Sequence, residues 1–336
     1  MMRLPWFDYR APRSVADAAR ILAAEGPAAM LIAGGTDLLP NMKRRHQTPE
    51  VLVSLKVIEE LKKVSNGSGI ALGSALTLNE VLQLEQTPTA LRQAAAQVAT
   101  SHLRNMGTIG GNLCLDTRCT YYNQNYEWRK AIDFCLKKDG ETCWVATASK
   151  RCVAVSSTDT APALIALNAS VVLAGPAGER EIPVETLFKN DGIDYLSRRA
   201  DEILTKIRIP AKNFKSCYWK LRRRGSFDFP ILGVAVALRF SSEEIIEEAR
   251  VALGAVASRP FLVEKASEYL KGKKLTDDVI AEASAMIANR AKPMDNTDMD
   301  LYWRKEVADD FAGYALREVR GDDMRATRQR IARFQP

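Results

Sequence analysis

Five of the six cysteines in this 336-residue chain lie between Cys114 and Cys152, about an eighth of its length. Four of them, Cys119, Cys135, Cys143 and Cys152, have 15, 7 and 8 residues between them, and Cys114 lies just upstream. The segment that carries them is rich in aromatic, Lys, Asn and Asp residues and shows neither a helical nor a strand period. A long polar loop that concentrates thiols is typical of a segment folded around a metal or iron–sulfur centre. These residues therefore indicate a protein that transfers electrons.

Two paired-glycine turns could hold an anionic ligand. Gly34-Gly35 follows an apolar run, and Gly110-Gly111 lies further along the chain. Paired glycines let backbone N–H groups approach phosphates, so two such turns could grip the two phosphates of a dinucleotide. Either pair could equally form an ordinary tight turn. Neither matches G-x-G-x-x-G or G-x-x-x-x-G-K-[ST], which argues against the familiar doubly wound nucleotide-binding folds.

The composition is that of an ordinary globular protein of two or three domains, with 46% hydrophobic and 26% charged residues. The longest apolar stretch, residues 161–174, is too short to cross a bilayer, and the first residues lack the pattern of a secretory signal. We therefore expect a cytoplasmic protein with no membrane partner, in which thiols stay reduced. The net charge of +7 comes with interleaved acidic residues and no nucleic-acid motif, so we expect no nucleic-acid partner.

Helical and strand patterns alternate without a regular βαβ repeat, which predicts an α+β fold. Apolar residues at helical spacing predict helices over residues 14–24, 77–84, 91–100 and 161–167, and mostly helix after residue 261. Short apolar or alternating runs predict strands over residues 29–33, 51–55, 70–73, 170–174, 203–209, 216–220, 231–240 and 249–255.

The glycine turns belong to a more specific pattern. Gly34-Gly35-Thr36-Asp37, the RNMGTIGGN run at 104–112, Asp159 ahead of an Ala-Pro-Ala-Leu helix, and Lys220 before further basic residues stand in this order. From about residue 5 to residue 320 the chain resembles the FAD-binding medium subunit of the xanthine oxidase family of molybdenum enzymes. The resemblance implies two FAD-binding subdomains, residues 1–57 and 58–222, and a C-terminal α+β domain, residues 223–336, that docks other subunits.

In that family FAD is buried between the two N-terminal subdomains, and the glycine turns hold its diphosphate. The resemblance implies no catalytic residue in this subunit. It implies cofactor contacts by two turns and by four single residues, namely Ile32, Ala33, Gly34, Gly35, Thr36, Asp37, Leu38, Leu39, Thr108, Gly110, Gly111 and Asn112, with Val98, Asp159, Leu204 and Lys220.

The cysteines lie in an insertion, about residues 115–155, that most members of that family lack. Its sequence is similar to that of the β subunit of the 4-hydroxybenzoyl-CoA reductase branch, which implies a [4Fe–4S] cluster held by Cys119, Cys135, Cys143 and Cys152. Zinc would also accept four thiolates, usually through short C-x₂₋₄-C pairs that are absent here. Cys114 is left over and has the character of an unligated, packed cysteine.

The resemblance implies a heterotrimer with a molybdenum large subunit and a [2Fe–2S] small subunit, present as a dimer of heterotrimers. Electrons from a ferredoxin-like donor would pass through the cluster and FAD to the small subunit. Basic residues of the insertion predict a surface for an acidic donor, namely Arg118, Arg129, Lys130, Lys137, Lys138, Lys150 and Arg151. The alternatives are a complex that oxidises an aldehyde or an N-heterocycle, with electrons flowing outward, and a binding module without a redox role.

Overall fold

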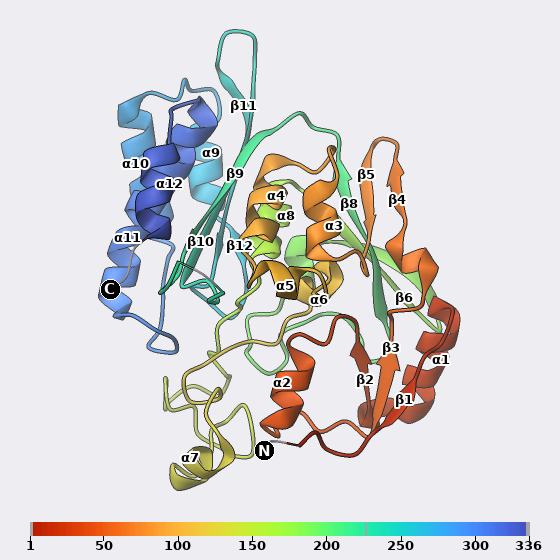
Figure 1. Cartoon of the computed structure of the whole chain (residues 1–336). Coiled ribbons are helices and arrows are strands. Elements are labelled where there is room, and N and C mark those ends of the chain that lie inside the picture. Colours follow the sequence, from red (N-terminus) through yellow and green to blue (C-terminus); the bar gives the residue numbers. More distant parts are fainter. Residues whose placement is uncertain (1–2, 226, 334–336) are drawn as a thin grey trace.

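The computed structural model describes residues 3–225 and 227–333, and Figure 1 shows three β-sheets with helices packed between and around them. The first sheet is parallel and the other two are antiparallel. Because helices cover these sheets without a repeated βαβ order, the α+β class predicted from the sequence is confirmed.

The N-terminal sheet has the order β1-β3-β2 and packs against one helix, α1 (Val15–Glu25). The Ser14 side chain accepts a hydrogen bond from the Asp17 amide and so caps this helix. After β2 the chain turns at Gly34-Gly35 and enters a short helix. These elements are β1 (Asp8–Arg10), η1 (Gly26–Ala28), β2 (Ala29–Ile32), α2 (Leu38–Lys43) and β3 (Val51–Ser54).

The second sheet has the order β4-β5-β8-β6-β7, so strands from before and after the cysteine insertion pair directly. Helices α3, α4, α6 and α8 pack on it, and their apolar side chains share one core with the sheet. The elements are η2 (Glu59–Lys62), β4 (Val64–Asn66), β5 (Gly69–Gly73), α3 (Leu78–Gln83), α4 (Thr89–Ala96), α5 (Ser101–Arg104), α6 (Ile109–Leu113), α8 (Thr160–Ala166), β6 (Ser170–Gly175), β7 (Gly178–Pro183), η3 (Val184–Leu187) and β8 (Ile203–Pro210).

The third sheet, β12-β11-β10-β9, is covered on both faces. Side chains alternate between the faces of a strand, so Cys217 and Trp219 of β9 enter the C-terminal core while Tyr218 enters the core of the second sheet. The expected domain limit at residue 223 falls inside this sheet. Its elements are β9 (Lys215–Leu221), β10 (Leu232–Phe240), β11 (Ile246–Gly254), β12 (Phe261–Leu262), α9 (Glu264–Leu270), α10 (Asp277–Ala288), α11 (Leu301–Arg320) and α12 (Arg325–Ala332).

The cysteine insertion is mostly irregular and lies beside α2 at the lower edge of the molecule in Figure 1. Its one α-helix among the described residues is α7 (Tyr126–Ala131), which the sequence pattern did not predict. The two ends of the insertion pair through Arg118 and Val155. The Asn296 side chain donates a hydrogen bond of 2.6 Å to the Val153 carbonyl, so the C-terminal domain also holds this segment.

Most of the predicted elements form within a few residues of their expected limits. The helix expected over residues 91–100 spans Thr89–Ala96 instead, because Gln97 and Val98 turn back onto Ala94 and Ala95. No helix among the described residues is long and apolar enough to cross a membrane.

Arg304 of α11 joins three separate loops beneath the third sheet. Its side chain is completely buried and donates hydrogen bonds to the carbonyls of Met294, Ile231 and Ala255, at 2.9, 3.1 and 2.9 Å. Burial lowers the pKa of this guanidinium to about 10. The hydrogen bonds to these three carbonyls, two of them in buried residues, compensate for the cost of placing a cation in the interior.

We expect Arg304→Met to lower the free energy of unfolding by about 2–4 kcal/mol, because the buried carbonyls of Ile231 and Ala255 lose their donor and three loops lose a common contact. Denaturant unfolding of the variant beside Lys305→Met, at an exposed position of the same helix, measures this. Equal midpoints for the two variants would contradict the role given to Arg304.

Candidate functional site

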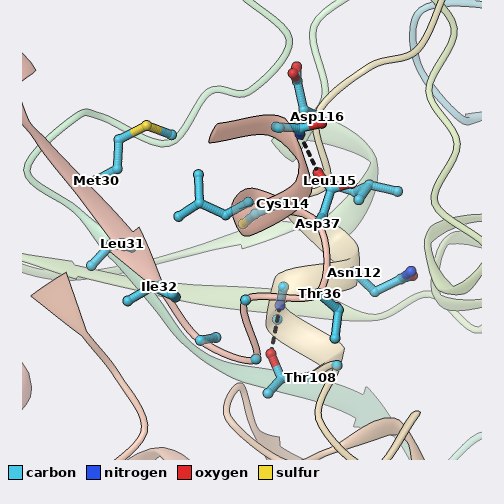
Figure 2. A pocket seen from close by; sticks show the side chains of 18 of the residues that line it. Met30, Leu31, Ile32, Thr36, Asp37, Thr108, Asn112, Cys114, Leu115 and Asp116 are labelled. Carbon is cyan, nitrogen blue, oxygen red and sulfur yellow. Dashed lines mark hydrogen bonds between the residues drawn. The ribbon is translucent and has the colours of Figure 1, made fainter. Parts of the chain in front are cut away.

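A cavity of about 540 Å³ lies between the first and second sheets. Its wall combines the end of β2, the turn that follows it, the segment from Gly107 to Arg118, and residues 195–204 before and within β8. Figure 2 shows Ile32, Thr36, Thr108 and Asn112 among the side chains that line it. The cavity is therefore built from segments that are distant in sequence and meet only in the folded chain.

The Gly34-Gly35 turn needs glycine at both positions. A Cβ on Gly34 would lie 1.9 Å from the Met106 carbonyl oxygen, and Gly35 has a φ of +69°. Among the described residues, the amides of residues 34–38 donate no hydrogen bond to another group of the chain. Unpaired amides that line a cavity at the start of a helix form a suitable site for an anion.

The Gly110-Gly111 pair is not a free turn, because it lies inside α6. The Gly110 amide donates to the Ser74 carbonyl at 2.9 Å, and the Gly111 amide donates to Oγ1 of Thr108 at 3.0 Å. A Cβ on Gly110 would lie 2.7 Å from that of Ser74. Gly110 therefore lets α6 pack closely on Ser74, whereas the amides of the first glycine pair have no partner in the described chain.

A buried ion pair closes the cavity on the side of the third sheet. Asp159 accepts hydrogen bonds from Nζ of Lys220 at 2.9 Å and from the hydroxyl of Tyr218 at 2.8 Å. Burial is the largest influence on both charged groups: it raises the pKa of Asp159 and lowers the pKa of Lys220. Nζ of Lys220 also donates to the Gln97 carbonyl, which ties the pair to the end of α4.

The structure gathers almost every cofactor residue expected from the sequence around this cavity. Residues 32–38, Val98, Thr108, Gly110, Gly111, Asn112, Asp159 and Leu204 all line it. Leu39 and Lys220 do not. Leu39 instead packs beneath Gly35, and Lys220 reaches the wall only through Asp159. Their expected contacts with the cofactor stay predictions.

The cavity wall also contains residues that the sequence pattern did not single out as cofactor contacts. They come from α2 and its end, the start of the insertion, and the loops before β8 and β10, and include Arg44, Gln47, Leu115, Asp116, Arg118, Tyr195, Arg198, Phe227 and Phe229. Cys114 lines the cavity too, rather than only packing into the apolar core. No local periodicity marks these positions, although Arg118 directly precedes a cluster cysteine.

The four spaced cysteines come together in the insertion. Cys119, Cys135 and Cys152 share one small apolar cluster with Tyr122. Cys143 is also buried and lies close enough to Cys152 to raise the pKa of that thiol. Burial raises the pKa of Cys119 to about 12 and that of Cys152 to about 11. The other two cysteines lie apart, and Sγ of Cys217 donates to a carbonyl of α11 in the C-terminal core, as expected of a packed cysteine.

The thiols are not arranged around a single ion. Zinc–sulfur bonds of 2.3 Å would place neighbouring sulfurs roughly 3.8 Å apart. No group of three His, Cys, Asp or Glu side chains in the described chain is placed to hold one metal ion. The structure therefore shows a gathered set of buried thiols and no preformed zinc site.

The basic surface expected on the insertion is smaller than its sequence indicates. Arg118, Arg129 and Lys137 are buried, and their charges pair with carboxylates. Their burial follows from the compact folding of the insertion, which the sequence did not reveal. Lys130, Lys150 and Arg151 are exposed, and Lys138 is partly exposed beside Asp139.

Comparisons with known proteins agree with this geometry. Residues 5–212 match the model of the FAD binding domain in molybdopterin dehydrogenase, and residues 216–319 match that of the CO dehydrogenase flavoprotein C-terminal domain. The chain is 24% identical to the glyceraldehyde dehydrogenase medium chain of Sulfolobus acidocaldarius, over 94% of this chain and 99% of that one. It is 29% identical to an aldehyde oxidoreductase FAD-binding subunit of Escherichia coli, over 85% and 93%.

The fold is also similar to that of a solved structure. The chain superposes on a carbon monoxide dehydrogenase chain of Hydrogenophaga pseudoflava with a TM-score of 0.76 and 27% identity. The match covers 94% of this chain and 97% of that chain.

We expect Gly34→Ala to abolish retention of FAD, because the added Cβ would displace the turn from the Met106 carbonyl. The bound flavin per chain after purification measures this effect. Gly67→Ala is the control, since a Cβ there meets no atom within 4 Å. Full flavin content in the Gly34 variant would show that the turn does not hold the cofactor.

Proposed function

The chain belongs to the family of FAD-binding medium subunits of the molybdenum hydroxylases, and on this premise we propose that it carries electrons between the partner subunits of such a complex. The match to the FAD-binding domain model covers well over half of the chain, and the cavity lies where that domain's glycine turns meet. The subunit's own task is to bind and orient the cofactors. We infer that its partners are a molybdenum-containing large subunit and a [2Fe–2S] small subunit.

The FAD cavity supplies two kinds of contact. The amides of residues 34–38 are placed to hold the diphosphate, and the apolar side chains of Ile32, Val98 and Leu204 line the wall. When bound, FAD accepts or donates electrons singly or in pairs, which suits a carrier between one-electron centres. The residues of the chain exclude water from this cofactor and fix its orientation.

We propose that Cys119, Cys135, Cys143 and Cys152 hold a [4Fe–4S] cluster. The observation that supports it is the chemistry around the buried sulfurs. The Ala154 amide donates a hydrogen bond to the Cys152 sulfur at 3.4 Å, and the Tyr121 and Tyr122 amides lie near enough to the Cys119 sulfur to favour its thiolate. Amide donors stabilise thiolates, and hydrogen bonds to the sulfurs are a known feature of iron–sulfur sites.

The cluster would add a one-electron centre beside the flavin cavity. Cys119 follows Arg118, a residue of the cavity wall, so the proposed cluster site and the FAD site adjoin in sequence and in space. Exposed Trp128 and Trp144 lie on the same insertion, together with Lys130, Lys150 and Arg151. We propose this aromatic and basic face as the entry point for a ferredoxin-like donor.

For the substrate of the complex we propose 4-hydroxybenzoyl-CoA, dehydroxylated reductively by electrons that enter through this subunit. The cysteine spacing and sequence of the insertion support that assignment. The second candidate is the oxidation of an aldehyde with electrons leaving through FAD. The similarity to the glyceraldehyde dehydrogenase medium chain and to the aldehyde oxidoreductase subunit favours it.

Cys135→Ser is expected to reduce the iron content from about four per chain to near zero, because three thiolates do not complete a Cys₄ site. Anaerobic purification followed by iron and zinc analysis and a visible spectrum tests this. Cys217→Ser, at an equally buried cysteine outside the set, is the control and should keep its iron. Retention of all iron by the Cys135 variant, or zinc in its place, would contradict the cluster.

The direction of electron flow can be tested with the whole complex. We expect reduced ferredoxin to support dehydroxylation of 4-hydroxybenzoyl-CoA, because the proposed cluster site adjoins the flavin cavity and shares its segment with the proposed docking residues. The assay compares this reaction with aldehyde oxidation in the presence of an electron acceptor. Turnover of aldehyde alone would favour the oxidising complex and reject the reductase.

A further inference from the structure

Carboxylates in the wall of the FAD cavity need compensating cations, and the cysteine insertion supplies two of these cations. Four carboxylates belong to this wall, those of Asp37, Asp116, Asp159 and Asp228, and the first two are labelled in Figure 2. Asp228 pairs with Arg224, four residues before it in the chain. The diphosphate of FAD carries two negative charges, so ionised carboxylates beside it would oppose binding. Each of these acids therefore needs a compensating cation nearby.

Asp116 obtains its cation from the middle of the insertion. Nζ of Lys137 lies 2.8 Å from Oδ1 of Asp116, and the side chains are only 7% and 6% exposed. The same ammonium donates to Oγ1 of Thr117 at 2.8 Å and to the Gly192 carbonyl at 2.6 Å. With its three donors engaged, Lys137 is fixed beside Asp116.

Asp37 obtains its cation from the start of the insertion. The Arg118 guanidinium forms an ion pair with Asp37 and donates to Oδ1 of Asn41 at 3.0 Å. Asn41 in turn donates to the second oxygen of Asp37 at 3.0 Å. Arg118 directly precedes Cys119. A residue beside a proposed cluster ligand therefore neutralises Asp37, which belongs to the glycine turn proposed to receive the diphosphate.

A third carboxylate of the wall, Asp159, obtains its compensating charge from outside the insertion. Asp159 pairs with Lys220 of β9, a strand outside the insertion. The wall carboxylates of this cavity are thus paired with cations, and the insertion supplies the cations for Asp37 and Asp116. Arg44 and Arg198 also line the cavity and form no ion pair with a carboxylate of the described chain, so the wall remains attractive to an anion.

We propose that the cysteine insertion completes the FAD site electrostatically, with Lys137 and Arg118 as positioning residues that neutralise Asp116 and Asp37. This deepens the proposed function, and it rests on FAD binding but not on the nature of the metal centre. Removing the Lys137 charge leaves a buried carboxylate that keeps hydrogen bonds from Tyr122 and Gln47 but has no compensating cation. Removing the Asp116 charge instead leaves an additional cation, which favours the same ligand.

The test is a charge cycle on the full-length chain. FAD affinity is measured by flavin fluorescence titration of the apoprotein for Lys137→Met, Asp116→Asn and the double variant. We expect Lys137→Met to weaken FAD binding at least about tenfold and Asp116→Asn to bind FAD as tightly as the unchanged chain or more tightly. The double variant should return to within about threefold of the unchanged chain, because no isolated charge remains. Lys138→Met, at a partly exposed neighbour, should have no effect.

A purely structural role for the pair predicts a different pattern. Weaker binding in Asp116→Asn, or a double variant no better than Lys137→Met, would overturn the proposal. If Lys137→Met does not fold, the double variant decides, since failure of that variant to bind FAD also overturns it. The unchanged chain is titrated and its iron measured in the same series. Absence of FAD binding there would reject the proposed function itself, and absence of iron would reject only the cluster.

Discussion

The contact between the Gly34 backbone and the Met106 carbonyl is the constraint on which the cofactor site depends. It brings the end of a parallel strand in the N-terminal sheet against the loop between α5 and α6 of the second sheet. Because a Cβ on Gly34 would lie 1.9 Å from the Met106 carbonyl oxygen, no side chain fits there. The amides of residues 34–38 have no hydrogen-bond partner in the described chain. The cavity between the two sheets, and the anion site at its edge, both follow from this one approach.

Charge compensation is the second organising feature. Burying a carboxylate costs several kcal/mol unless a cation and hydrogen bonds accompany it. The cavity meets this requirement with ion pairs that bridge separate segments: Lys220 to Asp159, Lys137 to Asp116 and Arg118 to Asp37. Each pair joins a wall residue to another part of the chain, so the electrostatics of the site and the packing of its segments cannot be changed independently.

Contacts with other segments of the chain explain how an irregular insertion holds a fixed arrangement of thiols. The Cys152 sulfur lies only 2.7 Å from the position that a Cβ on Gly192 would take, and the Tyr122 ring stacks on His46 with centroids 4.4 Å apart. Burial lowers the pKa of His46 and so favours its neutral, stacked form. Contacts with α2, with the loop before β8 and with Asn296 thus replace the regular hydrogen bonding that the insertion lacks.

The sequence by itself determined the class of fold and most of the elements, because apolar periodicity is a local signal. The glycine pairs and the family resemblance located part of the cavity wall. The sequence did not reveal that Arg129 and Lys137 are buried, nor that Gly110 lies within a helix. Only the tertiary structure decided which charges meet. Lys137 and Asp116 are 21 residues apart and Arg118 and Asp37 are 81 apart, and no local pattern encodes such a pairing. The folded chain selects these partners because a buried charge must be neutralised by whatever cation packing brings beside it.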